Sequence, residues 1–386
     1  MRCVVVGAGA WGLPAAAELA GRGHDVVLLD RHGIANRLSS SSGPTRLWRL
    51  THPDAVRVRL ALRSIDAMER LASRSGRTVH LRRGLLWRDD VSLEAVQAAL
   101  REVGVEHQVV ASQDVASRFP GLRPDGRAAV WQADAGPLLA GESMAAQAAL
   151  LAAAGGVVRS GQVVTEIRTR ASGVRIGCAD GRSLDADVVV LAPGPGAGPL
   201  LAQVGLELPL RPHLEQVVHF GDPTTSARTD DLPCLFDGPR DGVPGMYAMP
   251  TPGLGYKVGL DRPLRDYVEG DHDRSPDVHL VAVTAERVAR DLTAFPAHVL
   301  DAQVCSWTDS PDGRFVLDTL PGGIVVACGD SGEGFKFSAL MGILLADLAE
   351  GRTPDADVAT FSARRFASGG DLKNSPGGAL GHVLGR

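Results

Sequence analysis

Residues 2–30 read RCVVVGAGAWGLPAAAELAGRGHDVVLLD, and this stretch decides the fold of the chain. The apolar run Cys3–Val6 predicts a short buried strand, and Ala10–Arg22 has the pattern of a helix. Val26–Asp30 predicts a second apolar strand. The chain therefore opens with a βαβ unit, which is typical of an α/β fold with a parallel sheet.

The turn between the first strand and the helix carries a GxGxxG motif, formed by Gly7, Gly9 and Gly12. Such glycines let backbone N–H groups approach a pyrophosphate at a helix N-terminus. Asp30 ends the next strand, where a carboxylate accepts a hydrogen bond from a ribose hydroxyl. An ordinary glycine-rich turn does not account for Asp30, so the motif predicts dinucleotide binding. The motif alone does not separate NAD from FAD.

Composition sets the class of protein. The 386 residues are 44% hydrophobic and 22% charged, which suits a globular enzyme of two interwoven domains. A net charge of -5 gives no reason to expect nucleic acid or an anionic membrane as a partner. No apolar run approaches the roughly 20 residues that span a bilayer. Because the first apolar run leads directly into the glycine motif, we expect no signal peptide and a cytoplasmic location.

The cysteines, histidines and lysines indicate which kinds of site the chain can hold. The five cysteines are scattered and the eleven histidines form no metal-binding pattern, so we expect neither disulfides nor a metal. Of 40 basic residues only three are lysines, at Lys257, Lys336 and Lys373. A lysine that persists in such an arginine-rich chain is a candidate for a position where arginine would not work.

The remaining elements follow from periodicity. We expect helices at Ala55–Arg74, Leu93–Val103, Ala140–Ala154, Val278–Thr293 and Phe335–Glu350. We expect strands at Arg83–Trp87, within Val157–Leu191, at Leu214–Phe220 and Gly323–Gly329, and a hairpin within Met246–Leu260. Ser39–Pro44 reads as a loop, and the glycine-rich stretch from Ser368 reads as a loose tail.

Four further motifs follow in the order TRLWR at 45–49, YAMPTPGLGYK at 247–257, CSWT at 305–308 and GDSGEGFKFS at 329–338. With the glycine motif, they resemble the monomeric sarcosine oxidase and N-methyltryptophan oxidase family, within the glycine/D-amino-acid oxidase group of flavoproteins. The resemblance runs from Val4 to about Phe366. It favours FAD over NAD.

The resemblance implies roles for individual residues. Cys305 matches the cysteine that joins the flavin covalently, and Lys257 matches the lysine that promotes reaction with oxygen. Arg49 and Lys336 match the cations that hold a substrate carboxylate, while Arg46 lies beside the flavin ring. The other candidate site positions are Tyr247, Asp261 and Glu333 on the catalytic side and Gly7, Gly9, Gly12, Asp30, Thr45, Val164, Gly334 and Phe335 on the cofactor side.

Each role has a plainer alternative. Cys305 can be a small buried hydrophobe, and Arg49 can be a surface cation. Lys257 can lie on a solvated strand face. Lys336 stands between Phe335 and Phe337, where a lysine is costly unless it meets an anion.

The sequence departs from the family pattern at four positions. Asp261 and Glu333 stand where sarcosine-oxidising members have histidines, Trp307 replaces a tyrosine, and Ser42 replaces a further histidine. Members that oxidise cyclic imino acids also carry an acid at the position of Asp261. These changes favour a cyclic imino acid, or an amino acid with a polar side chain, over sarcosine. The alternative is that Glu333 faces solvent and Asp261 caps a turn.

The resemblance thus predicts a two-domain α/β fold with a Rossmann-type FAD domain (residues 1–80, 143–208 and 300–386) and an antiparallel-sheet substrate domain (81–142 and 209–299). It implies a monomeric oxidase that converts the C–N bond of a small amino or cyclic imino acid to an imine and reduces O₂ to H₂O₂. A flavin dehydrogenase that uses another electron acceptor and an inactive nucleotide-binding protein are the alternatives.

Overall fold

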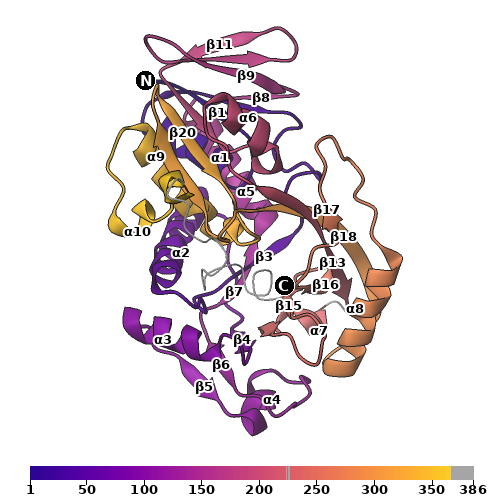
Figure 1. Cartoon of the computed structure of the whole chain (residues 1–386). Helices are drawn as coiled ribbons and strands as arrows, with labels where there is room; N and C mark the ends of the chain where they lie inside the picture. The colour runs from indigo at the N-terminus through magenta and orange to yellow at the C-terminus, as the bar shows by residue number, and fades with distance from the viewer. Residues whose placement is uncertain (223, 225–226, 367–386) are drawn as a thin grey trace.

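The computed structural model describes residues 1–222, 224 and 227–366, so the expected loose tail from Ser368 lies outside the described residues. A first large sheet holds the N-terminus (Figure 1). Its described strands lie in the order β19 (Val316–Leu320), β20 (Ile324–Cys328), β12 (Val188–Leu191), β1 (Arg2–Val6), β2 (Asp25–Asp30) and β8 (Val157–Ser160). All neighbouring pairs are parallel except β19–β20. The expected βαβ unit is confirmed, although α1 (Gly12–Gly21) begins at Gly12 rather than at Ala10.

Both faces of this sheet are covered, because alternate residues of β1 point to opposite sides. Cys3 and Val5 face the core that includes the helices, while Val4 and Val6 face a second apolar cluster. The second cluster is shared with a small sheet of β9 (Val164–Thr169), β10 (Val174–Cys178) and β11 (Ser183–Ala186). Such two-sided burial explains why these strands are continuous apolar runs.

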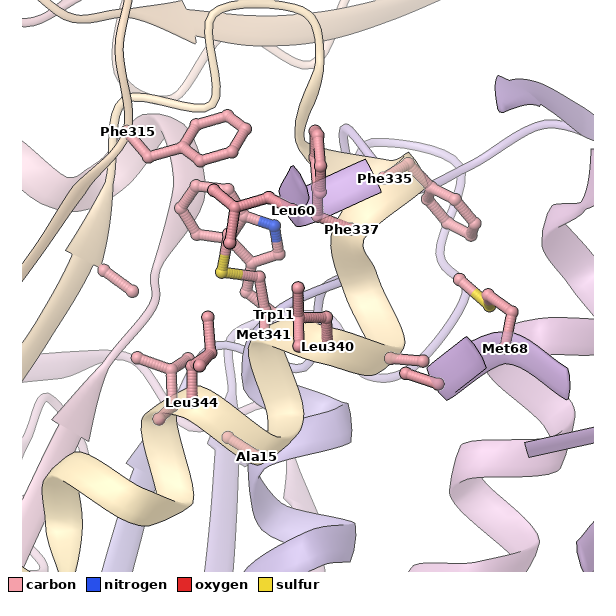
Figure 2. Close-up of a cluster of buried hydrophobic side chains, with 14 of the residues drawn as sticks. Trp11, Ala15, Leu60, Met68, Phe315, Phe335, Phe337, Leu340, Met341 and Leu344 are labelled. Atoms are coloured by element: carbon pink, nitrogen blue, oxygen red, sulfur yellow. The ribbon is translucent and has the colours of Figure 1, made fainter. Parts of the chain in front are cut away.

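Helix α9 (Ser338–Ala349) packs directly on α1 in the main core. A β-carbon at Gly342 would lie 2.7 Å from the Pro14 side chain and 2.8 Å from Pro14 backbone atoms, so glycine permits this approach. Figure 2 shows the cluster beside this contact, in which Trp11, Phe315 and Phe337 gather. The Trp11–Phe315 and Phe315–Phe337 ring centroids are 5.3 and 5.2 Å apart, both in edge-to-face geometry.

The second large sheet is mixed. Its described strands lie in the order β17 (Arg265–Asp266), β13 (Arg211–Phe220), β16 (Gly255–Leu260), β15 (Met246–Thr251), β14 (Cys234–Asp237), β4 (Leu85–Arg88), β6 (Ala129–Gln132) and β5 (Gln108–Val110), with β18 (Val299–Asp309) also on β13. Pairing is antiparallel except between β4 and β14. The β15–β16 pair is the hairpin expected within Met246–Leu260.

A two-stranded ribbon of β3 (Thr45–Trp48) and β7 (Gly136–Leu139) lies between the two large sheets (Figure 1). The other described helices are α2 (Ala55–Ser75), α3 (Leu93–Val103), α4 (Val115–Arg118), α5 (Ala140–Ala153), α6 (Ala197–Gln203), α7 (Ala227–Asp230), α8 (Val278–Asp291) and α10 (Ala356–Ala359). Short 3₁₀ turns are η1 (Ser112–Asp114), η2 (Gly194–Gly196), η3 (Gly334–Phe337) and η4 (Ala363–Phe366). Among the described helices, none is long and apolar enough to cross a membrane.

Two expectations from periodicity need correction. Thr45–Trp48 is a strand that was not expected, because its partner β7 lies about ninety residues later in the chain. The expected helix Phe335–Glu350 divides into η3 and α9, since Phe335 and Phe337 turn inward before the regular helix begins. The domain boundary drawn at residue 300 falls within β18, and the division of the chain into two domains stays a prediction.

Candidate functional site

A continuous pocket extends from the glycine turn to the large mixed sheet, and Gly7, Asp30, Cys305, Lys257 and Glu333 all line it. At its first end the backbone of the glycine turn is tightly confined. Gly7 has φ 102°, and a β-carbon there would lie 2.3 Å from the carbonyl oxygen of Ala192. A β-carbon at Gly12 would lie 1.9 Å from the oxygen of Gly7, so the motif needs glycine at both positions.

Asp30 ties this turn together. Its Oδ2 accepts from the backbone N–H of Ala8 at 2.8 Å, and its Oδ1 accepts from His32 at 2.7 Å and from Gly33 at 2.6 Å. Because a carboxylate has about four acceptor positions, Asp30 retains capacity for a hydroxyl donor. Val164, at the start of β9, lines the same end of the pocket.

Arg46 holds the loop 39–44, whose serines also line the pocket. Its guanidinium donates to the carbonyl oxygens of Ser40 at 2.9 Å and Thr45 at 2.8 Å, and lies 5.7 Å from the Phe335 ring centroid. Thr45 is fully buried and its hydroxyl bonds that of Thr251 at 2.8 Å, which joins β3 to β15. Arg46 and Thr45 therefore fix the pocket wall.

Lys257 is buried in β16 and donates from Nζ to the carbonyl oxygen of Thr45. Burial lowers the pKa of Lys257 to about 7, with a further lowering from Arg46 and partial opposition from Cys305 and Glu215. Lys257 is therefore not on a solvated strand face. It is a cation that burial makes easy to deprotonate.

Cys305 lies on β18 directly opposite Glu215 of β13, and both residues line the pocket. Burial raises the pKa of the Cys305 thiol. Burial also raises the pKa of Glu215 to about 7, against the hydrogen bond from Tyr247 and the charges of Arg46 and Lys257.

The Glu215–Tyr247 pair faces the same space. The Tyr247 hydroxyl donates to Oε1 of Glu215, and its ring lies over Gly259, where a β-carbon would be only 2.3 Å from the ring. Sequence reasoning included Tyr247 but missed Glu215. The available signal was an acid in the interior of the apolar strand Leu214–Phe220.

Arg49, Glu333 and Lys336 meet at the far end of the pocket. Oε1 of Glu333 accepts from Nη2 of Arg49 at 2.7 Å and from Nζ of Lys336 at 3.1 Å. Glu333 therefore does not face solvent, and the two cations expected to hold a substrate carboxylate hold a protein carboxylate. Burial lowers the pKa of Lys336 to about 7 against the opposing charge of Glu333.

Asp261 follows β16 and lines the same end of the pocket. Burial raises its pKa well above the ordinary value, and the charges of Glu215 and Asp89 add to the rise while Arg49 opposes it. Burial therefore makes Asp261 a weaker acid than an exposed aspartate.

Gly334 and Phe335 connect this end of the pocket to the glycine turn. The indole N–H of Trp11 donates to the carbonyl oxygen of Gly334 at 3.0 Å, and a β-carbon at Gly334 would lie 3.1 Å from the Trp11 ring. Of the residues at departures from the family pattern, Ser42 and Trp307 also line the pocket, and the Trp307 indole donates to Asp309 at 2.9 Å.

Comparison with known proteins agrees with this geometry. Residues 2–348 match the model of the FAD dependent oxidoreductase family. The chain belongs to this family. It is 30% identical to the peroxisomal sarcosine oxidase of Homo sapiens (95% of this chain, 96% of the relative) and 28% identical to the monomeric sarcosine oxidase of Streptomyces avermitilis (95% and 97%). Among solved structures it is similar to NikD, described as an unusual amino acid oxidase essential for nikkomycin biosynthesis, with 26% identity, a TM-score of 0.82 and coverage of 94% and 96%.

Membership establishes an FAD-dependent oxidoreductase, and the described residues fit that cofactor. The confined glycine turn lines the pocket where α1 begins, and a helix N-terminus is the place where backbone N–H groups bind a pyrophosphate. The pocket then continues without interruption past Arg46 to Cys305 and Lys257, which gives an extended dinucleotide a path from Asp30 to the mixed sheet. The two-domain α/β class expected from the sequence is that of this family.

Proposed function

We propose that this FAD-dependent oxidoreductase oxidises the C–N bond of a small amine or amino acid to an imine and reduces O₂ to H₂O₂. The observation that carries the proposal is the placement of the buried Lys257 in one pocket with Cys305 and the glycine turn. FAD, when bound, supplies the two-electron acceptor. The protein supplies orientation, proton handling and charge.

Glu215 is the group we propose to handle the amine proton. Its carboxyl faces the pocket, and its pKa of about 7, raised by burial, lets it accept a proton from an ammonium near neutral pH. The Tyr247 hydroxyl, which donates to its Oε1, holds that carboxyl in position.

Lys257 is the residue we propose for the reaction with oxygen. Its Nζ is fixed by the carbonyl oxygen of Thr45, so the cation is held in place before any charge develops on O₂. Preorganised charge of this kind stabilises a developing anion more than mobile water does. We also propose that Cys305 holds the flavin covalently and that Asp30 accepts from the ribose.

Oxygen uptake and peroxide release with a substrate panel test the function. The panel is sarcosine, proline, pipecolate, piperideine-2-carboxylate, common L-amino acids and N-methylated amines that lack a carboxylate. We expect at least one compound to produce one H₂O₂ per O₂ consumed. Reduction of the bound flavin by an amine without any consumption of O₂ would instead identify a dehydrogenase.

The monomeric state and the cytoplasmic location expected from the sequence remain part of this proposal. Size-exclusion chromatography with light scattering tests the first, and fractionation of the source cells tests the second.

A further inference from the structure

Glu333 fills the position between the two cations at the end of the pocket. One oxygen, Oε1, accepts from Arg49 at 2.7 Å and from Lys336 at 3.1 Å. The other, Oε2, lies 3.4 Å from Nε of Arg57, and Nδ1 of His52 lies 3.8 Å from Oε1. Arg49, Glu333 and Lys336 are exposed by only 6%, 6% and 7% respectively, so the contacts form away from bulk water.

Glu333 is ionised in this setting. Burial would raise its pKa, but Lys336, His52, Arg57 and Arg49 outweigh burial and hold the pKa well below the ordinary value. The surrounding cations therefore favour the charged carboxylate in the folded pocket. Arg49 and Lys336 bind the Glu333 carboxylate as they would bind the carboxylate of a substrate.

Arg49 is held in its position beside Glu333 and is not free to turn toward a second anion. Nη1 of Arg49 donates to the carbonyl oxygen of Thr51, and its guanidinium lies 4.5 Å from the Trp87 ring centroid. Trp87 in turn stacks on Phe236 with ring centroids 3.9 Å apart, so Arg49 is fixed by packing as well as by hydrogen bonds.

The third cation, Arg57, is also engaged. Its Nη2 donates to the carbonyl oxygen of Gly313 at 2.6 Å, and its Nη1 lies 3.4 Å from Asp54. A substrate carboxylate placed between Arg49 and Lys336 would have to displace Glu333 or lie against it. Two carboxylates that share one site repel each other.

From this arrangement we infer that Glu333 is a built-in occupant of the anion position and that the preferred substrate is an amine with no carboxylate on the reacting carbon. The inference rests on the proposed amine oxidation and narrows it, because it excludes simple α-amino and α-imino acids as the best substrates. Two other acids of the pocket fit this class. Glu215, on β13, and Asp261, directly after β16, line the pocket and present carboxyl groups, which suit an amine better than an anion.

Carboxylate binding is the direct test. Acetate, with acetamide as the neutral analogue of the same shape, is titrated into the flavin-loaded enzyme and followed by the flavin absorbance and by calorimetry. Glu333→Gln keeps the size of the side chain and removes its charge. We expect acetate to bind the variant more tightly than the wild type by about tenfold to 100-fold, because like charges a few ångströms apart are costly in a buried site. Acetamide binding should change little.

The matched control is Glu350→Gln. Glu350 also accepts from an arginine, Arg22 at 2.8 Å, but it lies outside the pocket. The Glu350→Gln variant should bind acetate with the same affinity as the wild type. If Glu333→Gln does not fold, the substrate preference of the wild type, described below, decides alone.

Substrate preference is the second readout. N-Methylethylamine and sarcosine differ chiefly in the carboxylate, and each is mixed anaerobically with the enzyme while flavin reduction is followed. We expect the wild type to be reduced at least tenfold more efficiently by N-methylethylamine, and Glu333→Gln to shift the preference toward sarcosine. Tighter acetate binding by the wild type than by Glu333→Gln, or a wild-type preference for sarcosine, overturns the inference. Failure of every amine and amino acid to reduce the flavin would instead overturn the proposed function.

Discussion

The carboxylate of Glu333 accepts a hydrogen bond from the guanidinium of Arg49 at 2.7 Å, although the two residues are 284 positions apart in the chain. A second contact, from the Trp11 indole to the Gly334 carbonyl oxygen at 3.0 Å, joins the same turn to the glycine motif. The end of the pocket is therefore built where the first and last motifs of the chain meet. Its geometry depends on how closely α9 packs against α1.

The packing of α9 on α1 should tolerate no added side-chain atom. A β-carbon in Gly342→Ala would meet Pro14 at 2.7 Å, partly against backbone, so the helices must separate. We expect a loss of about 1–3 kcal/mol in the free energy of unfolding, measured by denaturant titration of the holoenzyme. Gly141→Ala is the control, because its β-carbon in α5 meets nothing within 4 Å and should leave stability unchanged or slightly higher. Equal effects of the two substitutions would contradict the packing argument.

Covalent attachment of the flavin should depend on Cys305. After acid precipitation, the wild type should retain flavin in the pellet, and Cys305→Ser should release it to the supernatant. Cys178→Ser is the control, since Cys178 is buried in β10 away from the pocket and should retain flavin as the wild type does. Release of all flavin from the wild type would remove Cys305 from this role and leave the oxidase proposal standing.

Lys257→Met should slow the reaction of the reduced enzyme with oxygen. The substitution removes the buried cation held by Thr45 and keeps most of the length of the side chain. We expect a decrease of about 10²–10³ in the second-order rate constant, as for other preorganised charges. Stopped-flow mixing with O₂ measures it, and anaerobic flavin reduction, which should change far less, is the internal control. An unchanged oxidative rate would show that Lys257 does not serve oxygen.

The same rate should depend on pH in a definite direction. Burial, with the charge of Arg46, lowers the pKa of Lys257 to about 7, and the lysine is a cation only below that value. The wild-type rate should therefore fall as pH rises through about 7. The Lys257→Met rate should stay flat over that range, and a wild-type rate that rises with pH would contradict the assignment.

The features that the sequence predicted correctly depend on residues close together in the chain. The glycine turn was predictable because Gly7 and Gly12 meet backbone oxygens that no other residue could approach. The helix Leu93–Val103 agrees with its predicted bounds, since its apolar spacing is regular and Gly104 ends it with φ 76°.

Long-range contacts explain what the sequence did not predict. The strand Thr45–Trp48 forms because it pairs with Gly136–Leu139, and the sequence around Thr45–Trp48 gives no signal of that distant partner. Glu215 belongs to the pocket only because β13 places it beside β18 and beneath Tyr247. Glu333 was expected near the pocket, but its bond to Arg49 required the packing of two ends of the chain.

Anaerobic spectroscopy of the purified holoenzyme tests the central claim most directly. The account predicts an oxidised flavin spectrum that an amine substrate bleaches in the absence of oxygen. Admission of O₂ should restore the spectrum, with one H₂O₂ formed per flavin reoxidised. A flavin that amines bleach but O₂ does not reoxidise, or a flavin that no amine or amino acid bleaches, would contradict it.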